Sequence, residues 1–127
     1  MYNTDNLRIV AKACHEANRQ YCIAIGDDSQ VKWEKAPAEI QQSAVDGVLK
    51  VINGDINHPK DLHTSWSKFK TENGWTYGPV KDAEKKQHPS LVPYEDLTEA
   101  EKLKDSLFFV VASHWIEQLR PFLTAQK

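Results

Sequence analysis

Aromatic side chains are the residues of this chain best suited to binding chemistry. They lie in predicted loops, just before predicted helices and on one helical face. They are Trp33, Trp66, Trp75, Tyr77 and Tyr94. A flat ring can stack on a purine, while a hydroxyl or ring edge orients it. The alternative is a place in the hydrophobic core, which we favour for Trp66 because it continues an apolar helical stripe; for Trp33 and Trp75 both roles stay open.

Basic side chains downstream of these rings suggest phosphate binding. Lys81, Lys85 and Lys86 lie close together, with His88 nearby as a further hydrogen-bond donor. Asp82 and a glutamate interrupt the run, and on sequence alone such a mixed segment is more often a solvated surface than an anion site.

Two histidines at matching positions on predicted helices, His15 and His63, have apolar neighbours. We expect each imidazole to bond a loop carbonyl and so to fix the loop. Ligand contact is the alternative, and it would place one imidazole on each side of a cleft.

Catalytic and metal-binding patterns are missing from the sequence. The five histidines form no HExxH pattern and no pair four residues apart, there is no CxxC, and no GxSxG, P-loop or GxGxxG occurs. Cys14 and His15 point about 100° apart on a helix and cannot form a dyad. Cys14 and Cys22 would lie about 12 Å apart on one helix, beyond the roughly 7 Å reach of a disulfide. We therefore predict free thiols, no metal, no cofactor and no enzymatic activity.

The composition is that of an ordinary globular domain. The 127 residues are 40% hydrophobic and 27% charged, with a net charge of -2. This balance gives no broad positive field for nucleic acids or anionic membranes, and no window reaches the roughly 18 apolar residues of a spanning helix. We expect a single domain over residues 1–127, in the cytoplasm, that binds neither nucleic acid nor membrane.

Periodic apolar positions and capping signals predict four helices and a mainly α fold. The first covers about residues 5–25. The second follows Pro37 and stops at Asn53-Gly54, and the third ends at Asn73-Gly74. The fourth starts at a capping box of Thr98 and Glu101 and ends at Pro121. For this last helix we predict that the apolar face carries the residues Leu103, Leu107, Val110, Val111, His114 and Trp115.

The segment between the third and fourth helices, residues 74–97, is long for a connection, and its large side chains favour an ordered loop that folds back onto the helices. A faint repeat is also visible. Residues 15–18 resemble residues 63–66, and residues 33–37 resemble residues 94–98. This repeat predicts two helical hairpins, in halves 1–56 and 59–121, related by a pseudo-two-fold axis with a cleft between their loops.

One stretch of sequence resembles a known family. The stretch contains His63 and Trp66, the run Gly-Trp-Thr-Tyr-Gly-Pro at 74–79, Lys85, and His-Pro-Ser-Leu-Val-Pro-Tyr at 88–94. In this order the motifs are similar to the repeat found in pairs in ryanodine-receptor calcium channels and singly in small bacterial and phage proteins. The resemblance covers residues 62–113, and the first half is similar to the leader half of the small phage-type members.

The resemblance implies a non-catalytic helical module that binds an adenine-nucleotide-like or nucleotide-derived molecule, for sensing or sequestration in phage–host conflict. A phage-encoded member would act in the host cytoplasm. The resemblance points to His63, Trp66, Trp75, Tyr77 and Lys85 as binding residues. Together with the positions considered above, the predicted ligand-binding residues are His15, Asn18, Trp33, His63, Trp66, Trp75, Tyr77, Lys85, His88 and Tyr94. Asn18 stands where the paired channel repeats have Trp, which argues against a symmetric two-tryptophan clamp. The alternatives are a protein-interaction module using the loop aromatics, self-association into a homodimer included, and a nucleotide hydrolase with His63 or His15 as general base.

Overall fold

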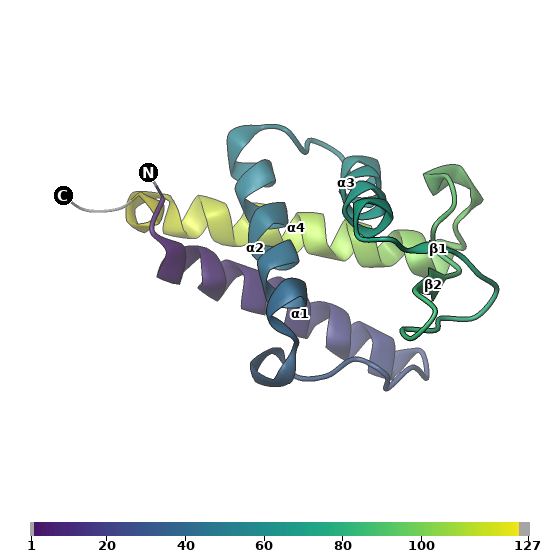
Figure 1. The fold of residues 1–127 in the computed structure, drawn as a ribbon. Helices are drawn as coiled ribbons and strands as arrows, with labels where there is room; N and C mark the ends of the chain where they lie inside the picture. The colour runs from purple at the N-terminus through teal and green to yellow at the C-terminus, as the bar shows by residue number, and fades with distance from the viewer. Residues whose placement is uncertain (1, 125–127) are drawn as a thin grey trace.

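Four helices make up most of the protein. The computed structural model describes residues 2–124, and Figure 1 shows the arrangement of its elements. The helices are α1 (Thr4–Ala24), α2 (Ala38–Asn53), α3 (Pro59–Glu72) and α4 (Glu99–Leu123). The mainly α fold and the four helices predicted from the sequence are therefore confirmed.

Capping residues set the helix boundaries. Asn3 accepts the Asn6 amide at the start of α1, and Gly54 ends α2 in the left-handed region at φ +82°. Thr98 caps α4 by accepting the Glu101 amide at 3.2 Å, as the capping box predicts. The Glu101 carboxylate, however, bonds Ser90 and Lys104 in place of reaching back to the cap. Only the Thr98 half of the capping box is therefore formed, because the Glu101 carboxylate bonds other side chains.

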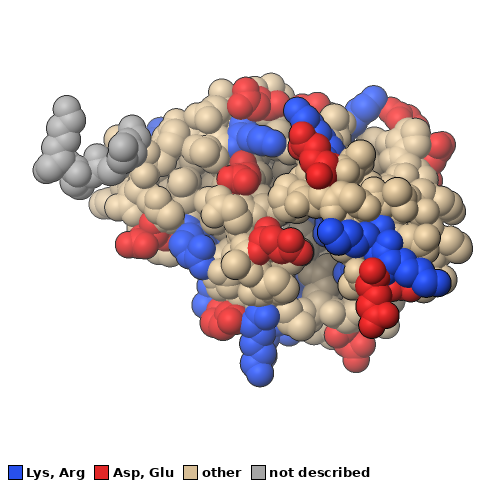
Figure 2. Space-filling model, in the orientation of Figure 1, with Lys and Arg blue, Asp and Glu red and all other residues tan. Residues whose placement is uncertain are grey.

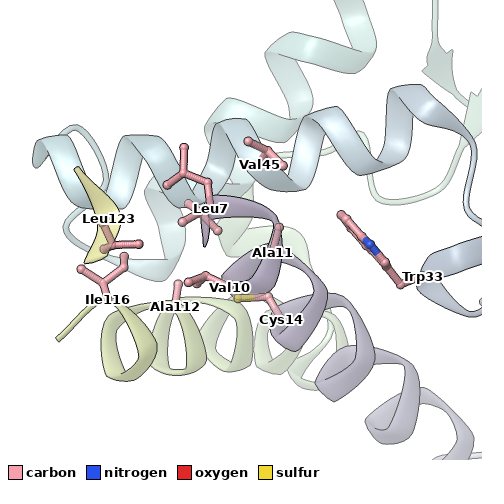
Figure 3. Close-up of a cluster of buried hydrophobic side chains, with 10 residues drawn as sticks. Leu7, Val10, Ala11, Cys14, Trp33, Val45, Ala112, Ile116 and Leu123 are labelled. Carbon is pink, nitrogen blue, oxygen red and sulfur yellow. The ribbon is translucent and has the colours of Figure 1, made fainter. Parts of the chain in front are cut away.

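The core lies where α1 and α4 run side by side and α2 crosses them (Figures 1 and 3). Its most buried side chains come from all three helices and from one loop tryptophan: Leu7, Val10, Ala11, Cys14, Trp33, Val45, Val48, Ala112, Ile116 and Leu123. The α1 residues have the spacing that was predicted for an apolar helical face. Burial of this kind of surface is the main stabilising contribution to the fold.

The predicted apolar face of α4 is wrong for Leu103, Val110, His114 and Trp115, which are exposed, whereas Val111 packs against the core as predicted. Val110 is 62% exposed, Leu103 52% and Trp115 39%. The face that packs on α1 carries Ala112 and Ile116 in their place. Residues 107–111 are an unbroken apolar run, so periodicity alone could not choose between the faces.

Pro121 also does not end α4, which continues to Leu123. A proline removes one backbone donor, and within the last turn only one helical bond is lost, so the turn can close around it.

The two hairpins, α1 with α2 and α3 with α4, contact each other unevenly. Contact between α1 and α4 is the most extensive in the molecule, whereas α2 and α3 touch over a short length. The ends of the described chain meet along the α1–α4 pair: Tyr2 bridges Thr124, and the Asn3 amide bonds the Leu123 carbonyl. The hairpins are thus held together mainly by the first and last helices.

The segment between α3 and α4 is ordered, as predicted, and it has structure of its own. β1 (Thr76–Tyr77) pairs in parallel with β2 (Gln87–His88), and the 3-10 turn η2 (Tyr94–Asp96) precedes α4. A matching 3-10 turn, η1 (Trp33–Lys35), precedes α2. The two-residue strands were not predicted because they are too short for an alternating pattern.

Gly78 is required by the close approach of these strands. A Cβ at this position would lie 2.6 Å from the Gln87 Cβ, so the strands would have to separate. We expect Gly78→Ala to lower the free energy of unfolding by about 1 to 3 kcal/mol, the usual cost of overpacking. Urea denaturation measures this change. Adding Gln87→Gly to this variant removes the Gln87 Cβ, so it should recover part of the lost free energy of unfolding. No recovery would contradict the steric explanation.

Two further sequence predictions concern membranes and thiols. Within residues 2–124 no helix is both long and apolar enough to cross a membrane. Cys14 and Cys22 lie on α1 and are unbridged, as predicted, and both are fully buried. Burial raises the pKa of the Cys14 thiol to about 12, so this side chain stays protonated and inert at neutral pH.

Candidate functional site

A cavity of about 330 Å³ lies between the two hairpins, and we call it the central cavity. Its walls come from α1, α2 and α3, while α4 and the β2 end of the ordered segment complete it. Figure 2 shows this face hollowed between α2 and the β1–β2 segment, with basic and acidic side chains on the rim. The volume is within the usual range for small-molecule pockets.

The structure divides the sequence-predicted site residues into three groups. His15, Asn18, His63, Trp66 and His88 line the central cavity. Trp75, Tyr77 and Tyr94 line a second hollow, described below, in which His63 also takes part. The remaining two residues line neither hollow. Trp33 is a core residue, 6% exposed, and Lys85 is exposed on the surface.

Both repeat histidines bond loop carbonyls, as expected. A ring nitrogen of His15, Nε2, lies 2.7 Å from the Val31 carbonyl oxygen, and Nε2 of His63 lies 2.7 Å from the Val92 carbonyl oxygen. In each case the carbonyl comes two residues before a 3-10 turn. Since a carbonyl only accepts, Nε2 carries the proton in both rings. The repeat therefore recurs as a local device that fixes the chain before α2 and before α4.

Aromatic rings form a cluster on the α3 wall of the central cavity. The Trp66 ring stacks on His63 at 5.6 Å between centroids and meets His88 edge-on at 4.9 Å. The Nδ1 atom of His88 accepts the Ser90 amide at 3.0 Å, which leaves Nε2 as the donor of the neutral ring. Burial lowers the pKa of His88 to about 4, with Lys81 and Lys70 adding to the effect, so this ring is neutral at physiological pH.

Three lysines line the same cavity, and sequence analysis did not single them out. Lys70, on α3, is 7% exposed and has no carboxylate within 4.0 Å among residues 2–124. Its Nζ lies 4.3 Å from the centre of the Trp75 ring, a cation–π contact. Lys50 donates to the Ser65 hydroxyl at 2.7 Å, and only Lys104 is paired, with Glu101 at 3.1 Å.

Burial lowers the pKa of the Lys70 amine, and Lys81 adds to the effect, while Glu39 opposes it without forming an ion pair with Lys70. Lys70 lies four residues after Trp66 and seven after His63, which is the spacing of a single helical face. That spacing was the signal that could have identified it.

Acidic groups occupy the α4 wall. Asp105 lines the cavity, its side chain is 22% exposed, and one carboxyl oxygen lies 4.0 Å from Nδ1 of His63. Burial raises the pKa of Asp105 to about 7, and the neighbouring Glu101 carboxylate contributes. Near neutral pH this carboxyl is therefore about half protonated, and the negative charge opposing the lysines is reduced.

Ser67, His63 and Asp105 lie in the order of a catalytic triad. The Ser67 hydroxyl oxygen is 3.4 Å from Nε2 of His63, and Asp105 is on the other side of the ring. The same Nε2 atom, however, already carries a proton that it donates to Val92. It has no free lone pair with which to accept the serine proton, so the arrangement does not meet the geometric requirement for an activated nucleophile.

The second hollow, which we call the outer groove, lies on the other side of His63 and has a volume of about 640 Å³. The ordered segment and α3 form it, and Trp75, Tyr77 and Tyr94 supply its aromatic surface. Tyr77 is 57% exposed. The predicted cluster of loop aromatics thus exists, but it lines the outer groove in place of the central cavity, and Trp75 reaches the central cavity only through its contact with Lys70.

A family model of the RyR domain matches residues 36–110 of the chain. The match runs from Ala36, at the end of η1, through α2, α3 and the ordered segment to Val110 in α4. It therefore includes most of the residues that line the central cavity and the whole outer groove. Because the match covers more than half of the 127 residues and agrees with the family identified from the sequence motifs, the chain belongs to the RyR domain family.

Proposed function

We propose that the protein is a non-catalytic module that binds a nucleotide-like molecule in the central cavity. The observation that carries the proposal is Lys70, a residue only 7% exposed that lines the cavity and has no carboxylate within 4.0 Å of its ammonium group among the described residues. A buried cation is costly unless an anion meets it, and a phosphate or carboxylate of a ligand would do so.

The aromatic cluster beside Lys70 supports the other half of such a ligand. Trp66 and His88 are partly exposed to the cavity, and an aromatic wall next to a basic group suits a flat ring joined to a phosphate. Lys50 adds a second positive charge, and protonation of Asp105 weakens the opposing negative charge. The three lysines that line the cavity are matched in number by three acidic side chains, Asp46, Glu101 and Asp105, so the attraction for an anion is local, at the wall that carries Lys70 beside the stacking surface.

A binding role without catalysis is supported by the state of His63. This is the imidazole best placed to act on a nearby hydroxyl, but its bond to Val92 fixes the tautomer in which Nε2 donates. A site of this kind suits a protein that senses or sequesters a nucleotide-derived signal.

Replacing Lys70 with Met tests the proposal. A lost charge-assisted hydrogen bond is worth about 1.5 to 3 kcal/mol, so affinity for adenosine 5′-monophosphate should fall by roughly 10- to 150-fold at about 1.4 kcal/mol per decade. Isothermal titration calorimetry at physiological salt measures it. The control is Lys85→Met, which removes an equal charge from an exposed position that lines neither hollow.

The two variants separate a specific anchor from a general charge effect. Lys85→Met should bind as the parent does, and Lys70→Met should melt at the same temperature or higher, because methionine in this site needs no desolvated charge. Unchanged nucleotide affinity in Lys70→Met, or an equal loss in Lys85→Met, would contradict the proposed site.

A second candidate function rests on the outer groove. Tyr77 and Val80, 57% and 72% exposed, lie at or beside its aromatic surface and could contact a partner protein. Under this alternative, Tyr77→Ser would abolish association with the partner and leave nucleotide affinity unchanged. Co-purification of the wild type and the variant from the same cells distinguishes the two roles.

A further inference from the structure

Trp75 lies at the boundary between the two hollows. Its side chain lines the outer groove but not the central cavity, and Lys70 lines the central cavity but not the outer groove. The two side chains meet, because the Lys70 Nζ atom lies 4.3 Å from the centre of the Trp75 ring. Lys70 is therefore placed between this ring and the central cavity.

The sequence at the end of α3 fixes this contact. Gly74 turns the chain in the left-handed region at φ +87°, and its amide donates to the Thr71 carbonyl at 3.1 Å. The next amide, of Trp75, donates to the Lys70 carbonyl at 3.0 Å. These two hydrogen bonds define a Schellman motif, in which the side chains at the positions of Lys70 and Trp75 usually make an apolar contact. Here the motif brings an ammonium group to an aromatic face.

The Lys70 amine makes no hydrogen bond within residues 2–124, whereas the amines of Lys50 and Lys86 donate to a hydroxyl and to a backbone carbonyl. In this part of the chain the Asn18 amide oxygen is the one fully buried side-chain oxygen or nitrogen without a partner, so the Lys70 amine retains some accessible surface. An ammonium group has three N–H donors. The ring covers one side of the group, and the remaining donors are left for a ligand.

We propose that Trp75 is a positioning residue for the anion site: its ring holds the Lys70 ammonium group in place, with the free N–H groups directed to the central cavity. The inference rests on the proposed function, because it explains how the cation of that site is kept ready. A lysine side chain has a flexible four-carbon stem, and ordering such a side chain on binding reduces affinity. Contact with the ring orders it before the ligand arrives and stabilises the charge that burial has separated from water.

The variant Trp75→Leu removes the aromatic face and keeps an apolar side chain for the Schellman contact. Its affinity for adenosine 5′-monophosphate, titrated by calorimetry at physiological salt, should fall about two- to tenfold, the range for ordering one long side chain at about 1.4 kcal/mol per decade. Trp75→Phe keeps a face that attracts cations less well than indole, so it should lose less. The matched control is Trp115→Leu, at an exposed position on α4 that lines neither hollow, and it should bind as the parent does.

The same change in the Lys70→Met background separates positioning from direct contact. If the ring acts through the ammonium group, Trp75→Leu costs no further affinity once that group is absent. A second two- to tenfold loss in this background would show that the ring acts on the ligand or on the fold by another route, and would overturn the proposal. If Trp75→Leu melts below the titration temperature, Trp75→Phe takes its place in the double variant, where its smaller loss should again disappear.

Nuclear magnetic resonance of Lys70 gives a readout that needs no ligand. The protons on its Cε atom, next to the amine, should be shifted upfield by the ring current of the indole. Their signal is assigned by its absence from Lys70→Met. The upfield shift should vanish in Trp75→Leu and persist in Trp115→Leu. An ordinary lysine shift in the wild type would show that the ring does not hold the side chain.

The outcomes separate this inference from the proposed function. Failure of adenosine 5′-monophosphate to bind the wild type overturns the proposed function, and the positioning role with it. Binding by the wild type with unchanged affinity in Trp75→Leu, or with an equal loss in Trp115→Leu, overturns the positioning role alone. The site itself then still stands, because Lys70→Met tests it independently of the ring.

Discussion

Asp105→Asn is expected to raise the free energy of unfolding at pH 8 by up to about 4 kcal/mol, the value of three pKa units at about 1.36 kcal/mol each, and to change the pH dependence of stability. Burial, with a contribution from Glu101, raises the pKa of this carboxyl from 3.8 to about 7. Between about pH 4 and pH 7 the folded protein thus keeps a proton that the unfolded chain has released. Wild-type stability contributed by this group therefore falls as pH rises through that window.

Urea denaturation at intervals from pH 4 to pH 8 measures the effect as the difference between variant and wild type. The difference should be smallest near pH 4 and largest above pH 7. Any effect of the new amide that does not depend on pH shifts all of these values equally. Asp28→Asn, at an exposed position, is the matched control. A flat difference for Asp105→Asn would show that the carboxyl is ordinarily hydrated.

His88→Asn is expected to have the opposite pH dependence. Burial, followed by the charges of Lys81 and Lys70, lowers the pKa of His88 from 6.5 to about 4. As pH falls through this range the unfolded chain binds a proton that the folded protein refuses, so the wild type loses stability toward acid, by up to about 3 kcal/mol for 2.5 pKa units. Asparagine does not titrate, and its side-chain oxygen can still accept the Ser90 amide.

Urea denaturation between pH 4 and pH 7 measures the free energy of unfolding of the variant minus that of the wild type. This difference should increase as the pH falls. Loss of the Trp66 contact adds a cost that is independent of pH, so the slope of the difference and not its absolute value is the readout. His114→Asn, at an exposed position, is the matched control. A slope equal to that of the control would mean that His88 accepts protons freely in the folded state.

The helices could be predicted because local signals determine them. The Thr98 cap, the left-handed Gly54 and the spacing of small and apolar residues on α1 act within a few residues of each other. The buried face of α4 could not be predicted, because residues 107–111 are all apolar and so cover every side of the helix. Which of them become buried is decided by the contact with α1. Trp33 became a core residue for a similar reason: its partners, including His15 and Arg8, come from another helix.

The candidate site was predictable in part. The weak repeat was enough to identify His15 and His63 and the loop-fixing role that both take. Lys70 was overlooked because the basic run at residues 81–86 drew the phosphate prediction, although a lysine on the same helical face as His63 and Trp66 was the better signal. The unpaired state of Asn18 and the burial of Asp105 depend on the register of α1 against α4, which no local pattern encodes.

The pairing of the first helix with the last has a consequence for how the chain reaches this structure. Contacts between residues about 100 positions apart, such as Tyr2 with Thr124 and Cys14 with Phe108, join the largest packed surface of the fold. Loop closure over such a separation must precede the favourable burial, and contacts of long sequence separation slow folding. During synthesis α1 and α3 emerge before α4, the helix on which each packs most extensively. The central cavity can therefore form only after α4 has left the ribosome, so the fold and the proposed ligand site are completed in the same step.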